Sequence, residues 1–109
     1  MNREQRELIS YCVQSEGNVK VFKMMQEKLK VPRELLDTEG IWVSGLGYNL
    51  LHHACRRGWS ALVKELVENQ KMDVNKRRDP FSPTPLMLAV RNDRVDIATI
   101  LLGAPNMIR

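Results

Sequence analysis

The chain has 109 residues, enough for one compact domain, and its 43% apolar and 28% charged content is typical of a folded rather than a disordered protein. Its net charge of +4 is a mild basic excess, too small by itself to predict nucleic-acid binding. No apolar run reaches the roughly 18–20 residues of a membrane span, and the charged N-terminus lacks a secretory signal, so we expect an intracellular location, cytoplasmic or nuclear.

The first apolar pattern indicates two short helices separated by Gly17. In each, apolar residues recur at the spacing that lines one face of a helix. The positions are Ile9, Cys12 and Val13 before the glycine, and Val21, Phe22 and Met25 after it. The leading segment, Asn2 to Glu7, is polar, as expected for a terminal unit with one face in water.

The segment from Lys30 to Tyr48 is the longest connection, and its pattern leaves three structures open: an extra helical turn, an extended hairpin or a mobile loop. Two aromatic residues fall within it. An exposed aromatic would be an interface anchor, whereas the commoner fate is packing under its own loop. We predict packing for Tyr48, and both alternatives stay open for Trp42.

The segments that follow repeat one pattern at a shift of 35 residues, from Ala54 to Ala89. One shift aligns two apolar stripes and the turn between them, in which Gly58 meets Asp93. The stripes are Leu51, Ala54 and Cys55 with Leu62, Val63, Leu66 and Val67 in the earlier copy, and Leu86, Ala89 and Val90 with Ile97, Ala98, Leu101 and Leu102 in the later one. Helices this short are marginal alone, so we expect neighbouring copies to stack.

Capping residues mark where these helices begin and end. Thr84 followed by Pro85 predicts an N-cap with proline at the first helical position, and Asn49 can cap the earlier copy. Gly58 and Asp93 fall where a left-handed residue ends the first helix of each copy. Prolines exclude helix from the connection before Thr84, and we predict that Phe81 in this connection packs beneath its loop.

These motifs resemble the ankyrin repeat family. The run Thr84 to Ala89 is similar to the TPLHxA signature, Leu51-His52-His53-Ala54 carries its other half, and Asp73-Val74-Asn75 resembles the DVN before each finger. The resemblance implies an all-α solenoid of about three helix-turn-helix repeats with hairpin-like fingers. The expected boundaries are repeat 1 at about 5–36, a finger insertion at about 30–48, repeat 2 at about 48–79 and repeat 3 at about 82–109, all in one domain. The spacings exceed the family's 33, so the connections carry insertions.

The histidines and cysteines do not form a metal or catalytic pattern. Apart from Cys55, three residues after His52, no cysteine or carboxylate stands at i+3 or i+4 from either histidine, and one such pair does not complete a site. The resemblance assigns His52 a bracing hydrogen bond to backbone. Cys12 and Cys55 occupy small-residue positions of the predicted core. We therefore expect no cofactor, no metal and no enzymatic activity.

The candidate binding residues are mainly arginines at matching positions of successive repeats. Arg56 and Arg57 end one helix in positions that ankyrin proteins use on their concave face, and Arg91 and Asn92 fall in the matching positions. The full candidate set adds Arg77 and Arg78 of the finger, Trp59 and Trp42. Repeated guanidinium groups suit an acidic segment of a partner, and an ordinary solvated face is the competing interpretation.

The sequence therefore predicts a protein–protein interaction scaffold that binds its partner, with an acidic segment as the candidate ligand, through the concave helix face and the finger loops. Two alternatives stay open: binding of nucleic acid or another polyanion through the basic surface, and a structural role as the cytoplasmic segment of a larger channel, enzyme or adaptor. The apolar stripe from Ala98 to Leu102 has no polar outer side, so we expect further repeats, a partner or a second copy to cover that end.

Overall fold

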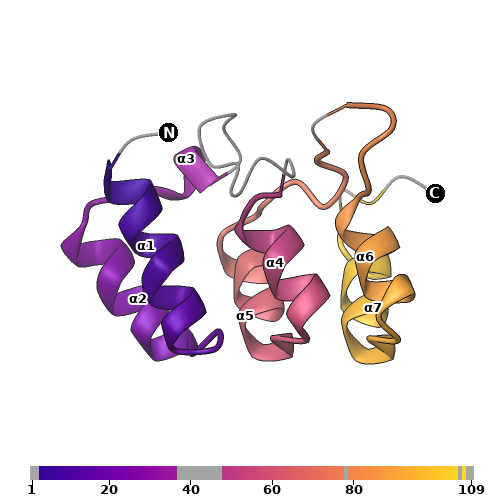
Figure 1. Cartoon of the computed structure of the whole chain (residues 1–109), viewed down its shortest axis with the longest axis horizontal. Coiled ribbons are helices and arrows are strands. Elements are labelled where there is room, and N and C mark those ends of the chain that lie inside the picture. Colours follow the sequence, from indigo (N-terminus) through magenta and orange to yellow (C-terminus); the bar gives the residue numbers. More distant parts are fainter. Residues whose placement is uncertain (1–2, 37–47, 78, 106, 108–109) are drawn as a thin grey trace.

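The computed structural model describes residues 3–36, 48–77, 79–105 and 107. Its helices form three pairs that stand side by side in chain order (Figure 1). The first pair is α1 (Arg3–Gln14) and α2 (Val19–Lys28), the second is α4 (Leu50–Arg57) and α5 (Ser60–Lys64) continued by the π-helix η2 (Glu65–Asn69), and the third is α6 (Pro85–Arg91) and α7 (Val95–Leu102). A short helix, α3 (Arg33–Leu36), follows the first pair. None of the helices in these ranges has both the length and the apolar character needed to cross a membrane.

The turns within the three pairs lie along one edge of the stack, which we call the turn edge, and the segment between the second and third pairs extends from the opposite edge (Figure 1). Each turn contains a left-handed residue: Gly17 with φ of 77°, Gly58 with φ of 82° and Asp93 with φ of 56°. The predicted ends of the first helices are therefore confirmed, including Asp93 in place of glycine.

The predicted helix starts are also confirmed. The Thr84 hydroxyl accepts a hydrogen bond from the Met87 N–H at 3.2 Å, and Pro85 occupies the first turn of α6. The Asn49 side chain accepts from the His52 N–H at 3.0 Å, while the Asn49 N–H donates to His52 Nδ1 at 3.2 Å. This reciprocal capping box satisfies two backbone donors at the start of α4 with side chains that are themselves buried.

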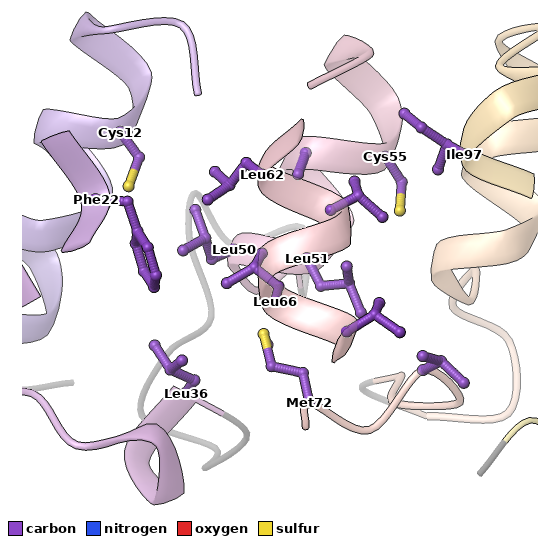
Figure 2. Close-up of a cluster of buried hydrophobic side chains, with 14 of the residues drawn as sticks. Cys12, Phe22, Leu36, Leu50, Leu51, Cys55, Leu62, Leu66, Met72 and Ile97 are labelled. Atoms are coloured by element: carbon purple, nitrogen blue, oxygen red, sulfur yellow. The ribbon is translucent and has the colours of Figure 1, made fainter. Parts of the chain in front are cut away.

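The core is continuous and lies between the pairs. Figure 2 shows Phe22 of α2 and Leu36 of α3 on the side that faces the second pair, where Leu50, Leu62 and Leu66 meet them. All five side chains are almost completely buried. Burial of one such side chain stabilises the fold by about 1.5–3 kcal/mol, so the contacts between neighbouring pairs contribute substantially to stability.

The second helix of the second pair differs from the prediction in one respect. Its stripe of Leu62, Val63, Leu66 and Val67 is buried as expected, but the helix changes from α to π at Glu65. The Gln70 N–H bonds to the Glu65 carbonyl at 3.1 Å, the i→i+5 pattern that accommodates one additional residue. Part of the extra length of this repeat is therefore absorbed inside the helix.

The π-helix places a polar network between the first and second pairs. The buried Glu65 carboxylate accepts hydrogen bonds from Asn69 at 2.6 Å and Gln70 at 2.9 Å, and Lys23 of α2 lies 3.5 Å from it. Gln26 of α2 donates to the Gln70 side chain at 2.9 Å. Burial acts to raise the pKa of Glu65, but these hydrogen bonds and the Lys23 ammonium outweigh it and leave the pKa lowered. The network thus holds the second pair to the first through a charged group.

The outer face of the third pair exposes part of its apolar stripes, as the sequence predicted for an end without a polar outer side. Ala89, Ile97 and Leu101 are buried, but Val90 is 62% exposed and Leu102 is 49% exposed. Both belong to the apolar stripes that the sequence predicted. They remain exposed because no helix pair in the described chain lies beyond α6 and α7 to cover them.

Candidate functional site

A groove of about 660 Å³ lies at the turn edge and crosses all three helix pairs. We call it the turn-edge groove, and its lining residues are Val13, Glu16, Arg56, Arg57, Trp59, Asn92 and Arg94. Four of these are among the residues predicted to bind a partner: Arg56, Arg57, Trp59 and Asn92. The sequence prediction missed Arg94 and the two residues contributed by the first pair.

Trp59 and Arg94 build the groove in the same way, one pair apart. Each is the N-cap of the second helix in its pair and lies over the turn glycine of the preceding pair. A Cβ atom added to Gly17 would stand 2.4 Å from the Trp59 ring, and one added to Gly58 would stand 2.7 Å from Arg94 Cζ. The 35-residue shift that aligns the repeats also aligns Trp59 with Arg94, and this signal could have identified Arg94.

Three guanidinium groups, those of Arg56, Arg57 and Arg94, line the turn-edge groove, and none forms an ion pair with a described residue. Arg57 Cζ lies 5.7 Å from the centre of the Trp59 ring, a cation–π contact. The ion pairs found in the described ranges, Arg3–Glu7, Lys23–Glu65 and Arg33–Glu34, involve none of the groove arginines. The Nε atoms of Arg56 and Arg94 are buried and have no hydrogen-bond partner among the described residues. The groove therefore gathers three guanidinium groups whose charge no ion pair among the described residues balances, and an anion can balance it.

The other predicted binding residues lie elsewhere. Arg91, the repeat equivalent of Arg56, is exposed and does not line the groove. Arg77 lines a separate hollow of about 260 Å³ beside Met87, and its Nη1 donates to the Pro80 carbonyl at 3.3 Å. Arg78 and Trp42 fall outside the described residues. The described arginines of the candidate set are thus divided between the turn edge and the segment on the opposite edge.

Phe81 does not pack beneath its loop as predicted. Its side chain is 98% exposed. The Asp79 carboxylate accepts from the Phe81 N–H at 2.9 Å and from the Ser82 hydroxyl at 3.1 Å, which fixes a local turn. The turn is held by its own polar contacts and therefore does not need the phenyl ring. Tyr48 behaves as predicted, because its ring is half-buried and stacks on His52 with centres 5.5 Å apart.

His52 braces the loop of the next pair, as the family resemblance implied. Its Nδ1 accepts from the Asn49 N–H, so its Nε2 carries the proton and donates to the Pro83 carbonyl at 3.2 Å. Burial lowers the pKa of His52 to about 4, although the backbone acceptors at Pro83 and Lys76 act to raise it. The ring is therefore neutral at pH 7 and has a structural role.

His53 is also buried, but its surroundings differ. Neither ring nitrogen has a hydrogen-bond partner among the described residues, and the ring contacts Tyr48 edge-on with centres 5.9 Å apart. Burial lowers the pKa of His53 to about 4, and the cations of Arg57 and Arg56 lower it further. The neutral ring packs inside the second pair, in line with the packing role predicted for it.

Both cysteines are core residues, as predicted. Cys12 and Cys55 are completely buried free thiols, and burial raises the pKa of Cys12 to about 12 and raises that of Cys55 as well. Neither is a thiolate near neutral pH. Within the described residues, no group of three histidine, cysteine or acidic side chains could hold a metal ion.

A stack of helix pairs with one turn edge and with connections on the opposite edge defines a helical repeat solenoid. Residues 9–108 match the family model of ankyrin repeats, in three copies, and the chain belongs to the ankyrin repeat family. It is similar to a curated ankyrin repeat protein of Rickettsia bellii, with 45% identity over 53 residues, which cover 47% of this chain and 44% of the relative.

The chain therefore matches less than half the length of that relative. No solved structure matches the chain significantly. Ankyrin repeats are in general protein–protein interaction modules and are not an enzyme fold.

Proposed function

We propose that this chain is a protein-binding module that holds an acidic segment of its partner in the turn-edge groove. The observation that supports this most is the meeting of Arg56, Arg57 and Arg94 in one groove without an ion pair among the described residues. Clustered like charges repel one another, so such an arrangement is unfavourable until an anion binds. Trp59 adds a flat aromatic surface of the kind that dominates protein interfaces.

The test is a pull-down from lysate, read by mass spectrometry, that compares the wild type with the double variant Arg56→Glu and Arg57→Glu. We expect the charge reversal to remove the partner, because two of the three groove cations become anions. The matched control is Arg91→Glu, which makes the same kind of charge change at the repeat-equivalent position outside the groove. Circular dichroism checks that each variant is folded. Undiminished recovery of the partner with the double variant would refute the proposal.

Nucleic-acid binding is the main competing function for a basic surface. The positions of Arg77 and Arg91 speak against it, because neither lines the groove and Arg77 lines a separate hollow. A protein that follows a phosphate backbone shows a steep dependence of affinity on salt. We expect labelled single- and double-stranded oligonucleotides to bind weakly if at all, and a steep salt dependence of tight binding would favour this alternative.

We propose a second contact for the outer face of the third pair, as part of a larger assembly of repeats. Val90, Met87 and Leu102 are each 47% or more exposed, whereas their equivalents in the second pair, Cys55, His52 and Val67, are buried. The face continues an interface that already exists within the chain. We therefore propose that a further helix pair of the same kind stacks on it.

A designed capping repeat, fused after Arg109, tests this second contact. We expect the fusion to raise the melting temperature, because the exposed stripe becomes buried. In the matched control, Val90→Lys and Leu102→Lys placed in the fusion should abolish the gain. A fusion whose melting temperature is no higher than that of the parent chain contradicts the proposal. So does a light-scattering measurement that finds the parent chain to be a dimer and finds the variant with Val90→Lys and Leu102→Lys to be a monomer.

A further inference from the structure

The net formal charge of the turn-edge groove indicates which anion would neutralise it. Its lining contains three arginines and one glutamate, which leaves a charge of +2. One aspartate or glutamate side chain supplies a single negative charge and two acceptor oxygens. A phosphate monoester supplies a charge of about −1.5 to −2 at pH 7 and three strong acceptor oxygens. The phosphate group therefore matches the groove in charge.

The donors of the groove point to the same ligand. The buried Nε atoms of Arg56 and Arg94 belong to different helix pairs, and both have no hydrogen-bond partner among the described residues. Arg94 lies across Gly58, the residue next to Arg57, so the three guanidinium groups come from one short stretch of the turn edge. A carboxylate is filled by one bidentate arginine, whereas the three oxygens of a phosphate can accept from the guanidinium groups of two arginines at once.

We propose that the turn-edge groove recognises a phosphorylated serine or threonine of the partner in preference to an aspartate or glutamate. The inference rests on the proposed function, since it names the group that the acidic segment places in the groove. Trp59 and Val13 give the residues beside that phosphate an apolar surface, while Asn92 offers one further donor. Glu16 lies in the same lining and repels any anion, but the three arginines outweigh it, and the net attraction grows with the charge of the anion.

The experiment is a titration of the whole chain, followed by nuclear magnetic resonance of the arginine Nε–H groups. The probes are the N-acetyl, N-methylamide derivatives of phosphoserine and of aspartate. Arg56→Gln and Arg94→Gln assign the two signals and remove the proposed contacts one at a time. Arg91→Gln is the matched control, because it removes an equivalent arginine that does not line the groove.

We expect the Arg56 and Arg94 signals to shift and saturate with the phosphoserine probe, with a dissociation constant at least about tenfold lower than that of the aspartate probe. Phosphate takes up its second proton near pH 6, so the affinity for phosphoserine should fall between pH 7.5 and pH 5.5, while that for aspartate should not. Glu16→Gln should tighten the binding of both probes. Arg94→Gln should weaken phosphoserine binding, and Arg91→Gln should leave it unchanged.

Two outcomes overturn this inference. The first is equal affinity for the two probes at pH 7.5, which would make the groove a general anion site. The second is the absence of a saturable shift with either probe. Dephosphorylation separates the inference from the proposed function. A partner that is lost on charge reversal of Arg56 and Arg57, yet is still captured after phosphatase treatment, leaves the acidic-segment proposal in place and contradicts the phosphate.

Discussion

The second and third helix pairs share one sequence pattern, yet their outer faces have opposite environments. Cys55 is completely buried, whereas Val90, 35 residues later, is 62% exposed. His52 is completely buried and Met87 is 47% exposed. The two members of each comparison occupy the same place on the same kind of helix. The difference shows that burial in this fold is decided by the next pair along the stack rather than by the pattern within one pair.

The largest expected effect comes from removing a side chain that the neighbouring pair covers. Leu51→Ala should lower the free energy of unfolding by about 2–5 kcal/mol, because Leu51 is completely buried and its loss leaves a cavity. Leu86→Ala, the equivalent change on the half-buried side chain, should have a clearly smaller effect. Urea unfolding followed by circular dichroism measures both. Equal losses would mean that the outer face of the third pair is covered in solution, and the comparison would fail.

Acid should destabilise the second pair specifically. The pKa values of His52 and His53 are lowered to about 4 from 6.5, so the unfolded chain binds more protons between these values. Stability is therefore complete above pH 6.5, falls as the pH drops toward 4 and changes no further below it through these groups. Between pH 7 and pH 5 the two histidines together should cost a few kcal/mol, on the order of 2 for each.

A change of His53 into its repeat equivalent sharpens this prediction. The equivalent residue in the third pair is Leu88, which is buried and does not titrate. His53→Leu should remove about half of the pH dependence of the melting temperature, and at pH 7 it should leave stability equal or higher, because two unpartnered ring nitrogens disappear. An unchanged pH profile would show that other groups control the acid response.

The substitutions His52→Met and Met87→His, which exchange the equivalent residues of the second and third pairs, should change stability by different amounts. His52→Met removes the donor to the Pro83 carbonyl and the acceptor of the Asn49 N–H, and should cost about 1–3 kcal/mol. Met87→His should change stability by less than about 0.5 kcal/mol, since the side chain at this position is half exposed. Thermal unfolding at pH 7.5 measures both. A marked stabilisation by Met87→His would reveal a backbone acceptor over the outer face.

The smallest effect is expected at the most exposed position of the predicted stripe. Val90→Gln should alter the free energy of unfolding by less than about 0.5 kcal/mol, because the valine buries little surface. Cys55→Gln, its counterpart, places an amide in a completely buried site and should be strongly destabilising. Urea midpoints of the two variants give the contrast directly, and a large loss for Val90→Gln would contradict the exposed face.

Most of the fold could be predicted from local sequence. The 35-residue shift, the caps at Asn49 and Thr84 and the turn residues Gly58 and Asp93 each reflect interactions within a few residues, and these were predicted correctly. The π-helix at Glu65 was not, because an inserted residue can be accommodated in a helix or in a loop, and spacing alone does not distinguish the two. The exposure of Phe81 depends on a side-chain turn that composition does not reveal.

The candidate site could be predicted only in part. Arg56 and Arg57 were found because they end a helix at repeated positions, and Trp59 and Asn92 lie close to them in the chain. Arg94 and Glu16 were missed, because their place in the groove depends on how far one pair reaches across the next. Arg91 was included on repeat equivalence, but equivalence along the chain does not ensure that two side chains reach the same surface.

Trp59 lies over Gly17 and Arg94 lies over Gly58, so each contact links two positions in neighbouring pairs. The large side chain after the turn fits only where the preceding pair has a glycine. The glycine and the large residue, 42 residues apart in the first case and 36 in the second, should therefore change together in related sequences. Asp93 takes the same left-handed conformation but has a Cβ, which at Gly17 and Gly58 would collide with the side chain above. A further helix pair stacked on the third would therefore need a short residue at the position that Trp59 and Arg94 occupy.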